Sequence, residues 1–233
     1  MNIEAVAVKP DLATASYTAI HDSDGELLHA VSDMRIFDNF MLPDFETIAL
    51  AIESSDAVVL DANLPEPALG EIVGYCRGKI IVADCVSCQK CKRLNGVMSA
   101  LSLLKVNLAE AIALIGSKDL ADSKNPAGCK DEIDEALLCD LHKLGPSQLL
   151  LSAGSEGVAI SDNAGVQRMS VSPKTDVVST SGAGDALLSG VLAAKLYGKK
   201  VSEQLRWGSI AAAETVGVHS ACSELISRQL LSR

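Results

Sequence analysis

A short run of small residues and one acid stands directly before a long apolar segment. Residues 179–190 read STSGAGDALLSG, so Gly182, Ala183 and Gly184 lead into Asp185. Glycine is a poor helix former, and a carboxylate facing an apolar segment is costly to bury. A turn of small residues at a helix N-terminus exposes unpaired N–H groups at the positive end of the helix dipole. Such a turn suits a phosphate, or the negative charge that develops during phosphoryl transfer.

Asp185 has two interpretations on this evidence. Beside an anion site, its carboxylate could accept the proton of an attacking hydroxyl group. It could equally be a capping acid at the start of the helix, with the glycines forming an ordinary turn. One glycine-rich turn does not separate the two interpretations, so other segments have to decide between them.

Composition excludes several classes of function. The chain has 233 residues, 48% hydrophobic and 21% charged, which is a globular composition with enough material for one substantial core. A net charge of −10 argues against nucleic acids and anionic membranes as partners. No uncharged apolar stretch approaches 18 residues, and residues 1–10 lack a secretion signal. Together with an odd count of 7 cysteines, these features predict a cytoplasmic protein with mostly free thiols.

Strand-like and helix-like segments alternate along the chain, which predicts a mostly parallel sheet covered on both faces, with ligands beyond the carboxyl ends of its strands. Two hairpins are also expected, one over 14–31 with a turn at 22–25, the other over 158–169. Buried strands are predicted at 57–61, 79–84, 101–105 and 148–152. Helices are predicted at 45–52, 66–76, 107–115, 131–144, 186–197, 202–216 and 223–231.

Four segments resemble the ribokinase-like (PfkB) carbohydrate kinases, and their order along the chain and their spacing agree with that family as well. TSGAGDA at 180–186 is similar to the family's C-terminal signature, and KVNLAE at 105–110 to its Asn-x-x-Glu motif. LSAGSEGV at 151–158 resembles the segment that lines the nucleotide, and DCVS at 84–87 the Asp-Pro-Val-Ser step after a central strand. The resemblance covers nearly the whole chain. It implies one ribokinase-like domain over 1–233, a three-layer α/β/α sandwich with a mostly parallel central sheet.

The resemblance implies a phosphoryl transfer that uses ATP and Mg²⁺. The amides of Gly182, Ala183 and Gly184 would hold developing negative charge, and Asp185 would take the proton from the hydroxyl that attacks the γ-phosphorus. Glu110 would organise Mg²⁺ through water or phosphate. The positions implied to bind the nucleotide are Asp84, Asn107, Glu110, Ser152, Gly154 and Gly157.

Four of these nucleotide positions have a structural interpretation as well. Asn107 could cap the helix that contains Glu110, and this role is compatible with nucleotide binding. Glu110 could also be a solvent-facing helix acid, and Gly154 and Gly157 could be ordinary turn glycines. Ser179 stands where many family members carry an acid associated with a monovalent cation, so potassium activation is not supported here.

The acceptor of the phosphoryl group is implied only by short and less specific sequence segments. TASY at 14–17, DSDGE at 22–26 and KC at 90–91 resemble the pseudouridine kinases within the family. This implies phosphorylation of a sugar or nucleoside hydroxyl, with pseudouridine converted to pseudouridine 5′-phosphate as the favoured reaction. Thr14 and Ser16 are the implied substrate contacts.

The resemblance begins after the family's first strand, its sugar-facing glycine pair and its N-terminal acid. We therefore expect an N-terminally truncated fold with a complete nucleotide half, a largely absent sugar half, and the hairpin at 14–31 as a remnant of the lid. The alternative function is a catalytically weak or inactive relative that binds nucleotide or acts as an interaction subunit. Loss of an early strand also predicts an exposed sheet edge, which a homodimer could cover.

A run of cysteines adds one further hypothesis. Cys85, Cys88 and Cys91 have the Cys-x-x-Cys-x-x-Cys spacing that occurs in iron–sulfur sites. The alternative is a loop that contains buried or half-buried free thiols. The remaining cysteines lack ferredoxin spacing and give no obvious fourth ligand: Cys76, Cys129, Cys139 and Cys222.

Overall fold

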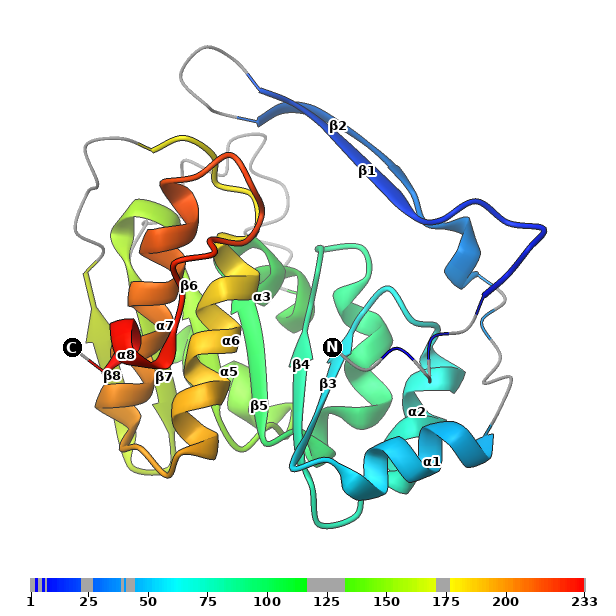
Figure 1. The fold of residues 1–233 in the computed structure, drawn as a ribbon. Helices are drawn as coiled ribbons and strands as arrows, with labels where there is room; N and C mark the ends of the chain where they lie inside the picture. Colours follow the sequence, from blue (N-terminus) through cyan, green and yellow to red (C-terminus); the bar gives the residue numbers. More distant parts are fainter. Residues whose placement is uncertain are drawn as a thin grey trace.

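The centre of the molecule is a six-stranded sheet with the strand order β3-β4-β5-β6-β7-β8 (Figure 1). The computed structural model describes residues 8–21, 27–38, 45–116, 133–170 and 177–232, together with Ile3, Val6 and Phe40. The first four strands of this sheet are parallel, and the last two continue it as an antiparallel hairpin. The strands are β3 (Ala57–Asp61), β4 (Ile80–Asp84), β5 (Leu103–Asn107), β6 (Leu149–Ser152), β7 (Val158–Asp162) and β8 (Gly165–Met169).

Helices cover the sheet on both faces. The layer on one face consists of α1, α2, α3, α5 and the 3-10 helix η2, and the layer on the other of α6 and α7. A short α8 follows α7 in the sequence, and the 3-10 turns η1 and η4 lie in connections. The helices are η1 (Arg35–Phe37), α1 (Phe45–Ser54), α2 (Glu66–Tyr75), η2 (Cys91–Ala100), α3 (Leu108–Ile115), α5 (Glu135–Lys143), η4 (Gly154–Glu156), α6 (Ala183–Leu196), α7 (Val201–Val216) and α8 (Arg228–Leu231).

Alternation along the central strands explains these three layers. In β5, Leu104 packs into the core cluster that contains Leu69 of α2, whereas its neighbour Leu103 packs into the cluster that contains Leu187 of α6. Successive strand residues point to opposite faces, so a strand with apolar residues at consecutive positions needs cover on both sides. The predicted α/β/α sandwich with a mostly parallel sheet is therefore confirmed.

Most predicted elements are confirmed, with differences at particular boundaries. The helix predicted at 223–231 is wrong over its first five positions, since α8 begins at Arg228. Ser227 caps it, because its hydroxyl accepts the N–H of Leu230 at 3.3 Å and ends the preceding loop. The strand predicted at 101–105 lies two residues later. Residues 91–100, for which no element was predicted, form the 3-10 helix η2.

A separate two-stranded antiparallel sheet contains β1 (Ser16–His21) and β2 (Leu27–Asp33). Figure 1 shows this hairpin extending away from the six-stranded sheet, on the side where the parallel strands end. Its turn, predicted at 22–25, lies outside the described residues. None of the helices in the described part of the chain has the length and apolar character that crossing a bilayer requires.

β3 forms one edge of the six-stranded sheet in the described ranges. Val59 on this strand is 55% exposed, an unusual value for a β-branched side chain in the middle of a parallel strand. Figure 1 shows the reason, because α6 and α7 lie over the strands farther along the sheet rather than over β3. The exposed sheet edge expected from the sequence is thus present, while its cover by a second copy stays a prediction.

The backbones of α6 and α7 are in contact where the two helices cross. A side-chain carbon at Gly190 would lie 2.7 Å from the carbonyl oxygen of Trp207, and one at Gly208 would lie 2.7 Å from that of Leu187. Real side-chain carbons do not approach backbone atoms so closely, so this crossing requires glycine at both positions. Because α6 starts at the turn 182–185, the crossing fixes where that turn stands.

Replacing Gly190 by alanine should lower the free energy of unfolding by about 1–3 kcal/mol, because the added methyl group forces the two helices apart. Urea titration followed by circular dichroism measures this change. Gly70 is the matched control, since it lies in helix α2 with open space around it. Gly70→Ala should stabilise the chain by about 0.5–1 kcal/mol. Equal effects of the two substitutions would contradict the tight crossing.

Candidate active site

The glycine turn begins α6 and leaves part of its first turn unpaired. Gly182 is the N-cap residue, with a φ of +79°, and a side chain there would overlap the carbonyl oxygen of Ala221. Among the described residues, the N–H groups of Gly184 and Asp185 have no hydrogen-bond partner, and no side chain caps the helix. The N–H of Ala183 makes one long bond, 3.3 Å, to Thr180. The turn therefore keeps donors available for an anion.

Asp185 lies in the first turn of α6 and is exposed, as a group that meets a substrate must be. Partial burial raises the pKa of its carboxyl above the ordinary value. The carboxylates of Asp84 and Asp61 raise this pKa further, whereas the ammonium of Lys105 lowers it. A raised pKa makes a carboxylate a better proton acceptor, provided that it stays ionised at the working pH.

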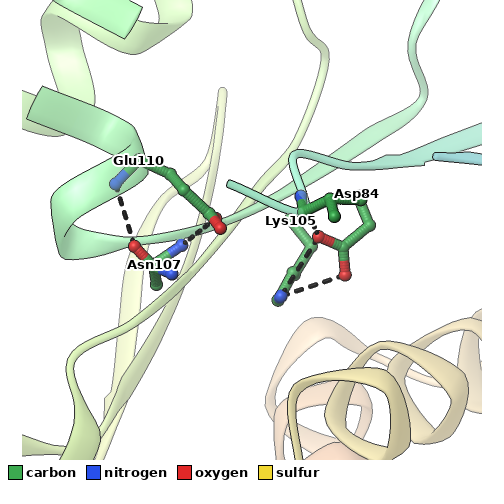
Figure 2. Close-up of polar contacts among 5 residues, drawn as sticks. Asp84, Lys105, Asn107 and Glu110 are labelled. Carbon is green, nitrogen blue, oxygen red and sulfur yellow. Dashed lines mark hydrogen bonds and ion pairs between the residues drawn. The ribbon is translucent and has the colours of Figure 1, made fainter. Parts of the chain in front are cut away.

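Three charged side chains stand in a row across neighbouring strands below this turn. Asp61 ends β3, and the strand register places it beside Asp84 of β4, which is in turn beside Lys105 of β5. Lys105 Nζ lies 2.9 Å from Asp84 Oδ2 and 3.2 Å from Oδ1, and both side chains are only 10% exposed (Figure 2). Lys105 was not predicted as a site residue. Its signal was a lysine inside an apolar strand run, directly before the Asn-x-x-Glu motif.

Asn107 and Glu110 form a reciprocal cap at the start of α3 (Figure 2). The N–H of Glu110 donates to Asn107 Oδ1 at 2.8 Å, and the N–H of Asn107 donates to Glu110 Oε2 at 2.9 Å. Glu110 is buried rather than solvent-facing, and burial raises its pKa, against the opposing effects of Asn107 and Lys105. The capping interpretation of Asn107 is therefore confirmed, and it places the motif's acid at the carboxyl end of β5.

The predicted nucleotide turn follows the next strand. Ser152 ends β6 and is the register partner of Asn107, so these two positions lie side by side. Gly157 has a φ of +108°, and a side chain there would run into the backbone of Met169, so glycine is required by the hairpin itself. Gly154, with a φ of +56°, has open space around its Cα. Gly154 therefore leaves room for a ligand to approach the backbone.

The charged groups fit a magnesium ion that arrives on nucleotide phosphates rather than a metal cage. No group of three or more histidine, cysteine, aspartate or glutamate side chains could hold a metal within the described ranges. Mg²⁺ usually keeps several waters and takes one or two carboxylates together with substrate phosphates. Glu110, the residue that the resemblance implies for this role, is buried and has one oxygen engaged by the Asn107 N–H, so it would act on such an ion through water or phosphate.

The predicted substrate contacts lie apart from this group. Thr14 precedes β1 and Ser16 begins it, so both belong to the hairpin arm and both are exposed. The hairpin extends away from the six-stranded sheet on which Asp84 and Lys105 lie (Figure 1). The structure therefore brings together Asp84, Lys105 and the 182–185 turn, but not the hairpin residues.

The cysteine run is a set of free thiols in the described part of the chain. Cys85 and Cys91 are buried and Cys88 is exposed. Burial is the main cause that raises the pKa of all three thiols, which disfavours the thiolate that metal binding needs. Cys129, one of the cysteines that lack ferredoxin spacing, lies outside the described residues. The site thus gives no support to an iron–sulfur cluster.

The sequence of this chain is similar to that of known carbohydrate kinases. Residues 2–228 match the pfkB family of carbohydrate kinases. The pseudouridine kinase of Escherichia coli strain K12 is 29% identical over 210 residues, which cover 88% of this chain. The chain spans 63% of the length of that relative.

Solved structures share the fold. A carbohydrate kinase from Agrobacterium tumefaciens is 32% identical, with a TM-score of 0.72 over 95% of this chain and 68% of that one. A ribokinase from Arabidopsis thaliana, solved with ribose and ATP, has a TM-score of 0.72 at 20% identity, over 94% of this chain and 68% of that one. At 20% identity, the similarity to the ribokinase shows the fold alone. The two structures together confirm the ribokinase-like architecture.

Asn107→Ala should lower the free energy of unfolding by about 1 kcal/mol, because the first turn of α3 loses its side-chain cap. Urea titration measures the change. Asp134→Ala is the matched control, since Asp134 caps α5 through the N–H of Ala136 at 3.0 Å. A similar loss is expected there. No loss in the Asn107 variant, with a normal loss in the control, would show that this cap does not stabilise α3.

The raised pKa of Glu110 predicts a pH dependence of stability. The folded state holds the Glu110 proton more tightly than the unfolded chain, whose glutamate pKa is about 4.5. The stabilisation from this group is present in full below that value and is lost as the pH rises through the folded-state pKa. Relative to Glu110→Gln, the free energy of unfolding of the parent protein should therefore decrease with rising pH. Urea titrations of both proteins between about pH 4 and 7 test the sign, and a relative increase would contradict it.

Proposed function

The chain belongs to the pfkB family of carbohydrate kinases, and we propose that it transfers the γ-phosphoryl group of ATP to a hydroxyl group of a sugar or nucleoside. The single observation that carries this proposal is the first turn of α6. There, N–H groups without partners among the described residues lie beside the exposed carboxylate of Asp185. This arrangement offers an anion cradle and a proton acceptor within one turn of helix.

The proposed reaction uses these groups in two roles. Asp185 accepts the proton of the acceptor hydroxyl as its oxygen attacks the γ-phosphorus, while the bond from phosphorus to the ADP oxygen breaks. The N–H groups at 182–184 hold the negative charge on the transferring phosphoryl group. Magnesium on the nucleotide would neutralise phosphate charge, and Glu110 would orient its water or phosphate ligands. Ser152, Gly154 and Gly157 would line the nucleotide, as would Asp84 through its place beside Lys105.

Pseudouridine is the acceptor we propose first. The supporting observation is the 29% identity to pseudouridine kinase, which extends over 88% of this chain. In this proposal Thr14 and Ser16 of the hairpin arm contact the nucleoside. The hairpin projects on the side where the parallel strands end, which is the side where α6 begins (Figure 1).

Asp185→Asn should reduce kcat by about 10²–10⁴-fold, because the amide cannot accept the hydroxyl proton. ATP binding, measured by isothermal titration calorimetry, should change little. Asp140→Asn is the matched control, because Asp140 is an exposed aspartate paired with Lys143 at 2.7 Å. Its turnover should equal that of the parent protein. Full turnover in the Asp185 variant would remove this residue from the role of base.

A panel of acceptors tests the substrate. Pseudouridine, ribose, fructose and adenosine are offered separately with Mg-ATP, and ADP release is coupled to a spectrophotometric signal. We expect the highest kcat/KM with pseudouridine. Higher values with another acceptor would overturn the acceptor assignment alone. ATP binding with no turnover on any acceptor would instead support the alternative, a relative that binds nucleotide without transferring its phosphate.

A further inference from the structure

We propose that the buried Asp84–Lys105 ion pair is a positioning device for the candidate active site: Lys105 braces the glycine turn and places a positive charge near Asp185. The inference rests on the proposed function, since it concerns the residue assigned there as the base. It adds a residue that the Asn-x-x-Glu and Gly-Ala-Gly-Asp motifs do not include, and a reason for glycine at one position of the turn.

The ion pair lies on the face of the sheet that α6 covers. Leu103 of β5 and Val82 of β4 pack into the same cluster as Leu187 of α6. Lys105 and Asp84 follow these residues by two positions, so their side chains leave the strands on the same face. At the carboxyl ends of the strands, the pair thus replaces the apolar layer and stands under the start of α6.

Asp84 is held from two directions. Besides Lys105 Nζ, the N–H of Val86 donates to Asp84 Oδ1 at 2.9 Å. Val86 has a φ of +62°, an unfavourable backbone conformation for a β-branched residue. Backbone strain of this kind persists only where the surrounding structure enforces it. The tight turn after β4 thereby holds the Asp84 carboxylate in place, and this carboxylate in turn holds the Lys105 ammonium group.

Lys105 occupies the space where residue 184 would carry a side chain. A side-chain carbon at Gly184 would lie 2.9 Å from Lys105 Nζ and 3.3 Å from its Cε. A lysine end can normally move away, but this one is buried and held by both oxygens of Asp84. Glycine at 184 is therefore matched to the lysine, and the turn rests against the ammonium group.

The charges around Asp185 give the pair its second role. Asp61 and Asp84 raise the pKa of Asp185, burial raises it as well, and Lys105 is the cation that lowers it. These groups come from three neighbouring strands and face the start of α6. Without the ammonium group, the pKa of Asp185 would rise further.

The test measures the Asp185 pKa directly by ¹³C carboxyl NMR, so it does not depend on finding an acceptor. Asp84→Asn should lower this pKa, because it removes a nearby negative charge while Lys105 stays. Adding Lys105→Gln to Asp84→Asn should raise it again by about one unit, because the cation is lost. Working in the Asp84→Asn background avoids an unpaired buried carboxylate that would titrate by itself. Lys105→Met replaces Lys105→Gln if the amide pair fails to fold.

Lys195→Gln is the matched control, since this half-buried lysine bonds Gln148 Oε1 at 3.1 Å and is not among the charges that act on Asp185. It should leave the Asp185 pKa unchanged. Equal Asp185 pKa values with and without Lys105 in the Asp84→Asn background would overturn the electrostatic role. If turnover is found, the acid limb of the pH profile of kcat/KM should shift among the variants in the same order as the pKa of Asp185.

A double-mutant cycle tests the bracing role through melting temperature alone. Gly184→Ala should lower the melting temperature of the parent protein. It should lower it less in the Asp84→Asn/Lys105→Gln background, where the side chain at 105 is shorter and uncharged. Additive effects would overturn the contact. A pKa shift without any kinase activity would support the inference while the proposed function fails, and turnover without the shift would show the reverse.

Discussion

The candidate site depends on a helix whose first turn is fixed by backbone contacts but keeps N–H groups without partners in the described structure. Gly182 lies against the carbonyl of Ala221, and Gly190 lies against the backbone of α7. Both contacts exclude a side chain, so the helix cannot slide or rotate without a clash. A rigid turn matters for phosphoryl transfer because such catalysis consists mainly of positioning and charge stabilisation. The packing of α6 on α7 therefore fixes the position of the turn at which the proposed reaction takes place.

The sheet contributes the charges that the helix lacks. Asp61, Asp84 and Lys105 follow one another across three parallel strands, and the α6 N-terminus lies above them. Two carboxylates and one ammonium group give the site a negative bias of its own, which favours a partner that brings positive charge. A magnesium ion on the phosphates would cancel part of the negative charge of a nucleotide, whereas a bare triphosphate would meet the full repulsion. In the proposed reaction, magnesium would therefore offset the repulsion between these carboxylates and the nucleotide phosphates.

The helical spacing of apolar residues and the short continuous apolar runs were sufficient to predict the layers. A parallel strand buried on both faces leaves such a continuous apolar run in the sequence. The cap at Asn107 was predictable for the same local reason, as its partners lie three residues apart. The Asp84–Lys105 pair was not, because its members are 21 residues apart and meet only through the strand register. The helix predicted at 223–231 failed over its first part, where small polar residues bond their own backbone and the cap sits at Ser227.

The cap between Asn107 and Glu110 has a consequence for the evolution of this family. Both side chains stabilise the start of α3, so selection for a folded protein would preserve them in a descendant that no longer transfers phosphate. Asp185 is exposed and carries no such structural burden, so it would be free to drift once catalysis is lost. On the proposed role of Asp185 as the base, position 185 would distinguish active from inactive members of the family better than the Asn-x-x-Glu motif does.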